Sequence, residues 1–145
     1  MRLAQRVRTS ASPSQVWQVL GRPSRWPEFE LVLKRVRGGD GPVAPGQTLM
    51  GVSRFASLAV PIDVLEAVPG SRLVLRVHAA PGVVERLTFE VVPLARGGSD
   101  ISVSVVVEGL FARAAVLPLW LGSALTTRVL GVRAERLARA ARSAA

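Results

Sequence analysis

The sequence predicts an α+β fold in which a seven-stranded antiparallel sheet wraps around one long C-terminal helix. Three observations support this class. Segments of alternating apolar and polar residues, typical of half-buried strands, occupy most of the chain before residue 110. Clusters rich in glycine and proline separate consecutive segments by only a few residues, which favours antiparallel neighbours. The one long helical pattern runs from Pro118 to Ala145.

The N-terminal part predicts one strand followed by two short helices. Residues Arg2–Thr9 alternate between two faces, one of them charged, as in an edge strand. Ser12 and Pro13 are residue types preferred at the N-cap and first position of a helix, and Gly21 favours its end. Residues 22–29 contain two prolines and predict a second short helix or a tight turn.

Six further strands are predicted between residues 31 and 108. Turn clusters such as Pro69-Gly70 and Gly97-Gly98 end them. The predicted strands are Leu31–Arg37, Gln47–Phe55, Leu58–Ala67, Arg72–Ala79, Val84–Val92 and Asp100–Glu108. No internal repeat or linker interrupts this order, so we expect a single domain over residues 1–145.

The C-terminal helix is predicted to bury one face. Pro118 suits the first helical position, where its missing N–H costs nothing. The opposite face of the second half is rich in arginine, as in a half-buried helix. Steps of three and four residues give an inward stripe of Leu119, Ser123, Thr126, Leu130, Ala134, Leu137 and Ala141. Because one helix covers a seven-stranded sheet incompletely, we expect a cavity between them.

Composition and charge narrow the classes of partner and location. The net charge is +9, but the 19 basic residues are spread along the chain, which favours a solvated basic surface over a specific nucleic-acid site. No apolar run follows the arginines of residues 1–10, so no signal peptide is predicted. The apolar stretch 114–127 is shorter than the roughly 20 residues that span a bilayer. We therefore expect a cytoplasmic protein without a specific nucleic-acid partner.

Several stretches resemble the helix-grip superfamily (SRPBCC-type), which includes START lipid-transfer domains, Bet v 1-like proteins and polyketide cyclases and dehydrases. Ala11–Leu20 is similar to its first strand-to-helix join, Arg25–Phe29 to its second short helix, and Glu66–Leu73 to its strand–proline–strand turn. The glycine turn at Gly97-Gly98 and the final helix fall at the corresponding places. The resemblance covers nearly the whole chain. It implies a pocket for an apolar molecule between the sheet and the final helix.

The first functional hypothesis is binding or carriage of a small hydrophobic molecule, such as a lipid, an isoprenoid or a polyketide. Burial of the ligand in an aliphatic cavity would supply most of the affinity. Inward-facing strand and helix positions are the candidate walls. The predicted ligand-binding residues are Leu75, Val77, Leu87, Phe89, Val103, Val105, Leu119, Ser123, Thr126 and Leu130.

The second hypothesis is an enzyme of the polyketide cyclase or dehydrase kind that uses the same cavity. The chain has no cysteine, no tyrosine and a single histidine, His78, so thiolate chemistry and a multi-histidine metal site are excluded. No cofactor, no metal and no particular catalytic residue is predicted. A buried carboxylate or arginine facing the cavity would favour the enzyme, and Arg54 and Arg76 are the candidate arginines. The candidate carboxylates are Glu28, Glu30, Asp63, Glu66, Glu85, Glu90 and Glu108, of which Asp63 and Glu90 are expected to point to solvent.

The third hypothesis is docking through the outer face of the C-terminal helix. Leu117, Leu121 and Leu125 form an apolar patch there with Trp120. Such a patch fits a protein partner, a second copy of this chain in a homodimer, or peripheral contact with a membrane. The alternative is that residues 111–116 fold back and cover it.

Overall fold

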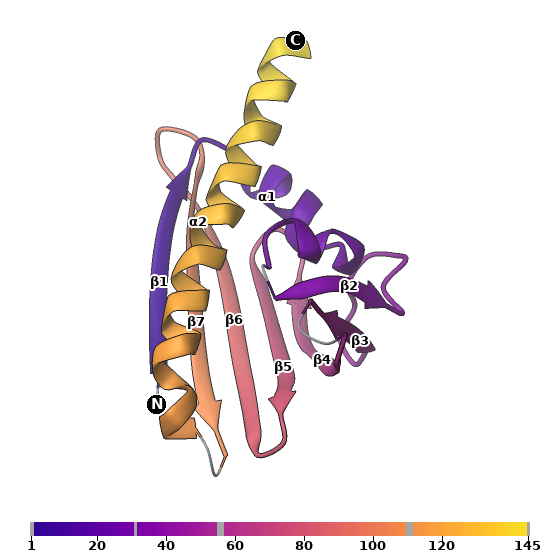
Figure 1. Cartoon of the computed structure of the whole chain (residues 1–145). Helices are drawn as coiled ribbons and strands as arrows, with labels where there is room; N and C mark the ends of the chain where they lie inside the picture. The colour runs from indigo at the N-terminus through magenta and orange to yellow at the C-terminus, as the bar shows by residue number, and fades with distance from the viewer. Residues whose placement is uncertain (1, 31, 55–56, 110–111, 145) are drawn as a thin grey trace.

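The computed structural model describes residues 2–30, 32–54, 57–109 and 112–144, and for residues 112–126 and 144 it describes the helical backbone alone. Within these ranges the order of elements confirms the predicted α+β helix-grip fold (Figure 1). The elements are β1 Arg2–Thr9, α1 Pro13–Leu20, the 3₁₀ helix η1 Pro23–Glu28, β2 Leu33–Arg37, β3 Thr48–Ser53, β4 Ala59–Val68, β5 Arg72–Ala80, β6 Val83–Pro93, β7 Ser99–Glu108 and α2 Ala112–Ala144.

The seven strands form one antiparallel sheet in the order β1-β7-β6-β5-β4-β3-β2. Consecutive strands pair along the meander, and β1 closes the far edge by pairing with β7. The register aligns Leu73 with Phe89 and Phe89 with Val103, so these side chains share one face of the sheet. All three are buried, which identifies this face as the one that covers the core.

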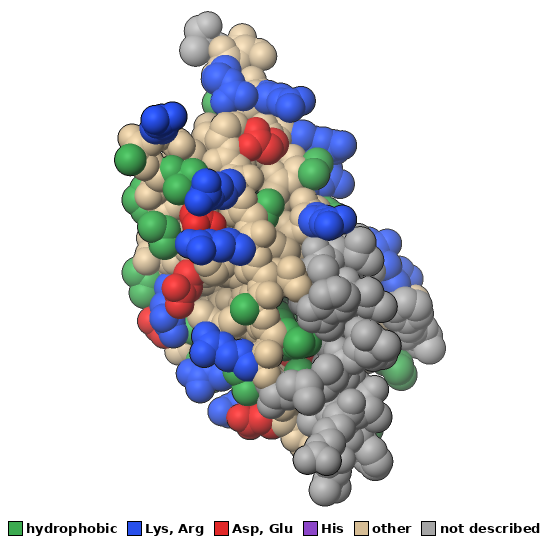
Figure 2. Space-filling model, turned by 90° about the vertical axis from the view of Figure 1, so that its left-hand side faces the viewer, with side chains coloured by type: hydrophobic (Ala, Val, Ile, Leu, Met, Phe, Trp, Pro, Cys, Tyr) green, Lys and Arg blue, Asp and Glu red, His purple; other side chains and the backbone are tan. Residues whose placement is uncertain are grey.

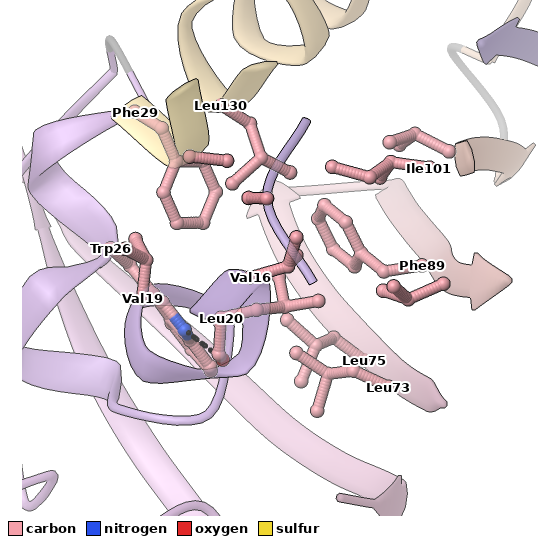
Figure 3. Packing of buried hydrophobic residues seen from close by; sticks show 14 of the residues in the cluster. Val16, Val19, Leu20, Trp26, Phe29, Leu73, Leu75, Phe89, Ile101 and Leu130 are labelled. Atoms are coloured by element: carbon pink, nitrogen blue, oxygen red, sulfur yellow. Dashed lines mark hydrogen bonds between the residues drawn. The ribbon is translucent and has the colours of Figure 1, made fainter. Parts of the chain in front are cut away.

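Local sequence signals explain the two short helices. Ser12 and Gln15 form a capping box, in which each side chain accepts a hydrogen bond from the other residue's backbone N–H. Gly21 caps the C-terminus of α1 at a site where a Cβ atom would lie 2.3 Å from Nε1 of Trp17. In η1, Trp26 donates a hydrogen bond from Nε1 to the carbonyl oxygen of Leu20 at 2.9 Å (Figure 3). This bond fixes η1 against the end of α1.

Helix α2 begins at Ala112, so the expectation that Pro118 takes the first helical position is wrong. The alanines of residues 112–115 favour helix strongly, and they extend the element upstream of the proline. Proline inside a helix lacks one backbone donor, and here that cost is outweighed. Among the residues that the structure describes, none of the helices contains an apolar stretch of the length that spans a bilayer.

Helix α2 packs chiefly on β1 and β7, at one side of the sheet (Figure 1). Its described buried residues are Thr127, Leu130, Gly131, Ala134 and Ala138. The predicted inward stripe is correct at Leu130 and Ala134 but wrong at Ala141, which is exposed. The reason is that the C-terminal end of α2 projects beyond the sheet (Figure 1), where Arg142 only reaches back to the hydroxyl group of Ser10 at 3.4 Å.

Candidate functional site: an apolar cavity with a buried carboxylate

A cavity of about 340 Å³ lies on the inner face of the sheet. In the described part of the chain, strands β3 to β7 form one wall, and the segment from the end of α1 to the start of β2 forms another. Its lining is mostly aliphatic and aromatic. The apolar lining residues are Leu20, Trp26, Phe29, Val32, Leu33, Leu58, Val60, Ile62, Leu73, Leu75, Val77, Ala79, Leu87, Phe89, Val103 and Val105.

Six of the predicted wall residues come together along this cavity. They are Leu75, Val77, Leu87, Phe89, Val103 and Val105. The cross-strand register explains the grouping, because Leu75 pairs with Leu87 and Leu87 pairs with Val105. The inward parity of one strand therefore fixes that of its neighbours.

The predicted wall residues on α2 are placed differently. Leu130 is fully buried in the hydrophobic core, in the same cluster as Phe29 and Ile101, and is not among the described lining residues (Figure 3). Leu119, Ser123 and Thr126 lie outside the residues whose side chains are described. The apolar patch at residues 117–125 lies outside them as well.

Residues before β3 contribute a wall that sequence reasoning did not assign. Leu20, Trp26 and Phe29 come from α1, η1 and the residue after η1. Phe29 meets Phe89 of β6 edge-to-face, with ring centroids 6.3 Å apart and an interplanar angle of 75° (Figure 3). The sequence signal was the two aromatic residues of the short segment 25–29, which has too few residues to bury both within itself.

Three polar side chains line the cavity in the described part of the chain: Glu30, Ser53 and Glu85. Glu85 is 9 % exposed and lies on β6 between Val77 of β5 and Val107 of β7. The described residues provide no hydrogen bond or ion pair for its carboxyl group. Burial, and secondarily the negative charge of Glu30, raises the pKa of Glu85 to about 7.

The position of Glu85 could have been inferred from strand parity. Leu87 and Phe89 are predicted wall residues of one strand, and Glu85 belongs to the same face because it lies two residues before Leu87. Glu90 lies on the opposite, outer face of β6, where its Oε1 forms a salt bridge with Nη1 of Arg72 at 3.0 Å. The alternation of side chains along β6 therefore predicts an inward Glu85, although a charged residue type on its own suggests an exposed position.

The other titratable candidates lie away from the cavity. Asp63 points outward, as expected, and its Oδ2 lies 3.3 Å from Nε2 of His78. Both side chains are on the solvent face of the sheet, so His78 does not reach the cavity lining. Glu28 pairs with Arg25 at 2.7 Å. Arg54 is exposed, and its Nε donates to the carbonyl oxygen of Leu33 at 3.0 Å.

The sheet, the helix packed on one side of it and the cavity beneath define a helix-grip domain. The chain belongs to the family described as "Polyketide cyclase / dehydrase and lipid transport", whose model matches residues 1–144. No curated protein matches the chain.

Solved structures share the fold at low sequence identity. Protein MLL2253 from Mesorhizobium loti is 18% identical, with a TM-score of 0.76 over 94% of this chain and 98% of that one. A START superfamily protein from Mycobacterium smegmatis is 14% identical, with a TM-score of 0.67 over 94% of this chain and 98% of that one. DynU16, a protein in the dynemicin biosynthetic locus, is 17% identical, with a TM-score of 0.67 over 95% of this chain and 47% of that one.

Proposed function

We propose that this protein binds or carries a small hydrophobic molecule, of the lipid, isoprenoid or polyketide class, in the cavity on the inner face of the sheet. The observation that carries the proposal is the apolar lining of that cavity by strand residues such as Leu75, Leu87 and Val105. Burying about 100 Å² of apolar ligand surface there contributes about 2.5 kcal/mol. Membership of the family supports the same class of ligand.

An entry route is available at the edge of the cavity. Val32 is 43% exposed and Leu58 is 62% exposed, although both line the cavity. Apolar side chains that face solvent and cavity at once suit the mouth of a pocket for a hydrophobic ligand. The ligand would enter between the start of β2 and the start of β4.

The proposal is tested with the neutral fluorescent probe N-phenyl-1-naphthylamine. Leu87→Trp places a larger side chain in the cavity, and Leu65→Trp, a 37% exposed position on β4, is the matched control. We expect saturable binding to wild type and to Leu65→Trp, and at least about tenfold weaker binding to Leu87→Trp. Circular dichroism establishes that both variants fold. Equal binding to all three proteins, or none to wild type, would refute the proposal.

A second function, a polyketide cyclase or dehydrase that uses the same cavity, is favoured by Glu85. A carboxyl group with a pKa of about 7 can accept and donate a proton near neutral pH. On a β-hydroxy carbonyl substrate, ionised Glu85 would take the α-proton as the carbon–carbon double bond forms. The same proton would then pass to the departing β-hydroxyl group, which leaves as water.

The enzyme is distinguished from the carrier by Glu85→Gln. The assay uses a β-hydroxyacyl thioester as substrate, and the unsaturated product is followed by absorbance and mass. If the protein is this enzyme, we expect Glu85→Gln to lower turnover by about a hundredfold or more, while the affinity for the probe stays within about twofold of wild type. Turnover by Glu85→Gln at the wild-type rate would exclude Glu85 as the acid–base group.

Four features stay predictions from the sequence. They are the cytoplasmic location, the single-domain organisation over residues 1–145, the homodimer, and peripheral membrane contact through the patch at Leu117, Leu121 and Leu125. Liposome co-sedimentation with Leu121→Glu as the control tests the last of these.

A further inference from the structure

Charge is distributed unequally between the surface and the cavity. The chain carries 19 basic and 10 acidic residues, and basic side chains are scattered over the face shown in Figure 2. The described lining of the cavity contains no arginine, lysine or histidine, but it contains Glu30 and Glu85. A strongly basic protein therefore has a cavity with charged groups of the opposite sign.

Glu85 is more than nine-tenths buried and directed into the cavity from the inward face of β6. No described side chain offers its carboxyl group a hydrogen bond or an opposite charge. Glu30, in the loop after η1, is the second carboxylate of the lining and is close enough to act on Glu85 through its charge. A buried carboxylate without a partner is costly, and a ligand that supplies the partner recovers that cost.

We propose that the cavity selects an apolar molecule that carries a protonated amine, with its ammonium group at Glu85 and its apolar body against Leu75, Leu87 and Phe89. This inference rests on the proposed binding function and adds the chemical class of the ligand. The ammonium group would donate charge-assisted hydrogen bonds to Glu85, and the charge of Glu30 would add attraction.

Two other classes of ligand fit this arrangement less well. A neutral carbonyl compound would accept one hydrogen bond from protonated Glu85 and would gain nothing from Glu30. A fatty acid would bring a third carboxylate into a cavity whose described lining holds no cation.

The test uses three ligands with the same alkyl chain: octylamine, 1-octanol and octanoate. Each displaces N-phenyl-1-naphthylamine from the protein at pH 7.5. We expect octylamine to bind at least about tenfold more tightly than 1-octanol, and octanoate to bind most weakly. Nonspecific attraction does not explain such an order, because a net charge of +9 repels amines and attracts carboxylates.

Matched variants assign the preference to the cavity. Glu85→Gln should bind octylamine and 1-octanol with affinities within about twofold of each other. The ratio of these two affinities in Glu30→Gln should lie between the ratios of Glu85→Gln and wild type. Glu108→Gln removes the same charge from an exposed position at the end of β7 and should keep the wild-type preference.

The outcomes separate this inference from the function beneath it. If 1-octanol binds as tightly as octylamine to wild type, or if Glu85→Gln keeps the preference, the inference is overturned while hydrophobic binding stands. If the probe and all three ligands fail to bind, the proposed binding function is refuted, and the inference about the amine is refuted with it.

Discussion

Oε1 of Glu135 accepts a hydrogen bond at 3.0 Å from Oγ1 of Thr9, which lies 126 positions earlier in the chain. The backbone N–H and the hydroxyl group of Ser10 donate to the same carboxylate. These bonds attach α2 to the end of β1 at one edge of the sheet. They hold the helix on the side opposite β3 and β4, and the inner face of the central strands stays available to the cavity.

We predict that Glu135→Ala lowers the free energy of unfolding by about 1 kcal/mol at pH 7. Donation from Ser10, chiefly from its hydroxyl group, lowers the pKa of Glu135 below its ordinary value of 4.5. The stabilisation is therefore present above pH 4.5 and is lost as the pH falls through the lowered pKa. Urea unfolding at neutral and acidic pH measures it. Glu108→Ala is the exposed control, and equal losses in both variants at pH 7 would contradict the account.

Gly131 of α2 lies against β1, and an added Cβ atom would lie 2.9 Å from Cγ2 of Val7. Alanine at this position gains about 1 kcal/mol of helix propensity, but Val7 is stiff at χ1 and must move to accommodate the methyl group. We expect Gly131→Ala to lower the thermal midpoint. In a Val7→Ala background the same change should raise it. A rise in both backgrounds would show that the contact does not limit this interface.

Glu85 predicts an unusual dependence of stability on pH. Because its pKa is raised from 4.5 to about 7, the folded state keeps a proton that the unfolded state has released. Stability should therefore fall as the pH rises from 4.5 to 7, and the full cost of about 3 kcal/mol applies above pH 7. Glu85→Gln should be more stable than wild type at pH 8 and nearly equal to it at pH 4.5. A variant less stable than wild type at pH 8 would contradict the assigned burial.

Trp26 supports the wall of the cavity through its hydrogen bond to the carbonyl oxygen of Leu20. We expect Trp26→Phe to cost about 1–3 kcal/mol, because the buried carbonyl group at the end of α1 loses its donor. Binding of N-phenyl-1-naphthylamine should weaken as well, since Trp26 lines the cavity. Unfolding and probe titration on one sample measure both. If the variant is as stable as wild type and binds the probe equally well, Trp26 contributes neither to stability nor to binding.

Sequence patterns predicted much of the fold but less of the site. Strand periodicity and turn residues located all seven strands to within two residues at each end, because each signal is local. Pro118 does not mark the start of α2, because the alanines within residues 112–115 favour helix upstream of it. The inward-facing residues of β5, β6 and β7 could be predicted because apolar and polar residues alternate along each strand. The wall formed by Leu20, Trp26 and Phe29 depends on how η1 folds over the sheet, which is a tertiary contact without a local pattern.

The proposed function requires that a hydrophobic molecule occupies the cavity on the inner face of the sheet. NMR of methyl-labelled protein titrated with the neutral probe N-phenyl-1-naphthylamine locates the bound molecule. We expect saturable shifts at the methyl groups of Leu75, Leu87 and Val105, with those of the exposed Val68 and Val92 unchanged. Saturable shifts confined to exposed methyl groups, or no saturable shift at all, would contradict it.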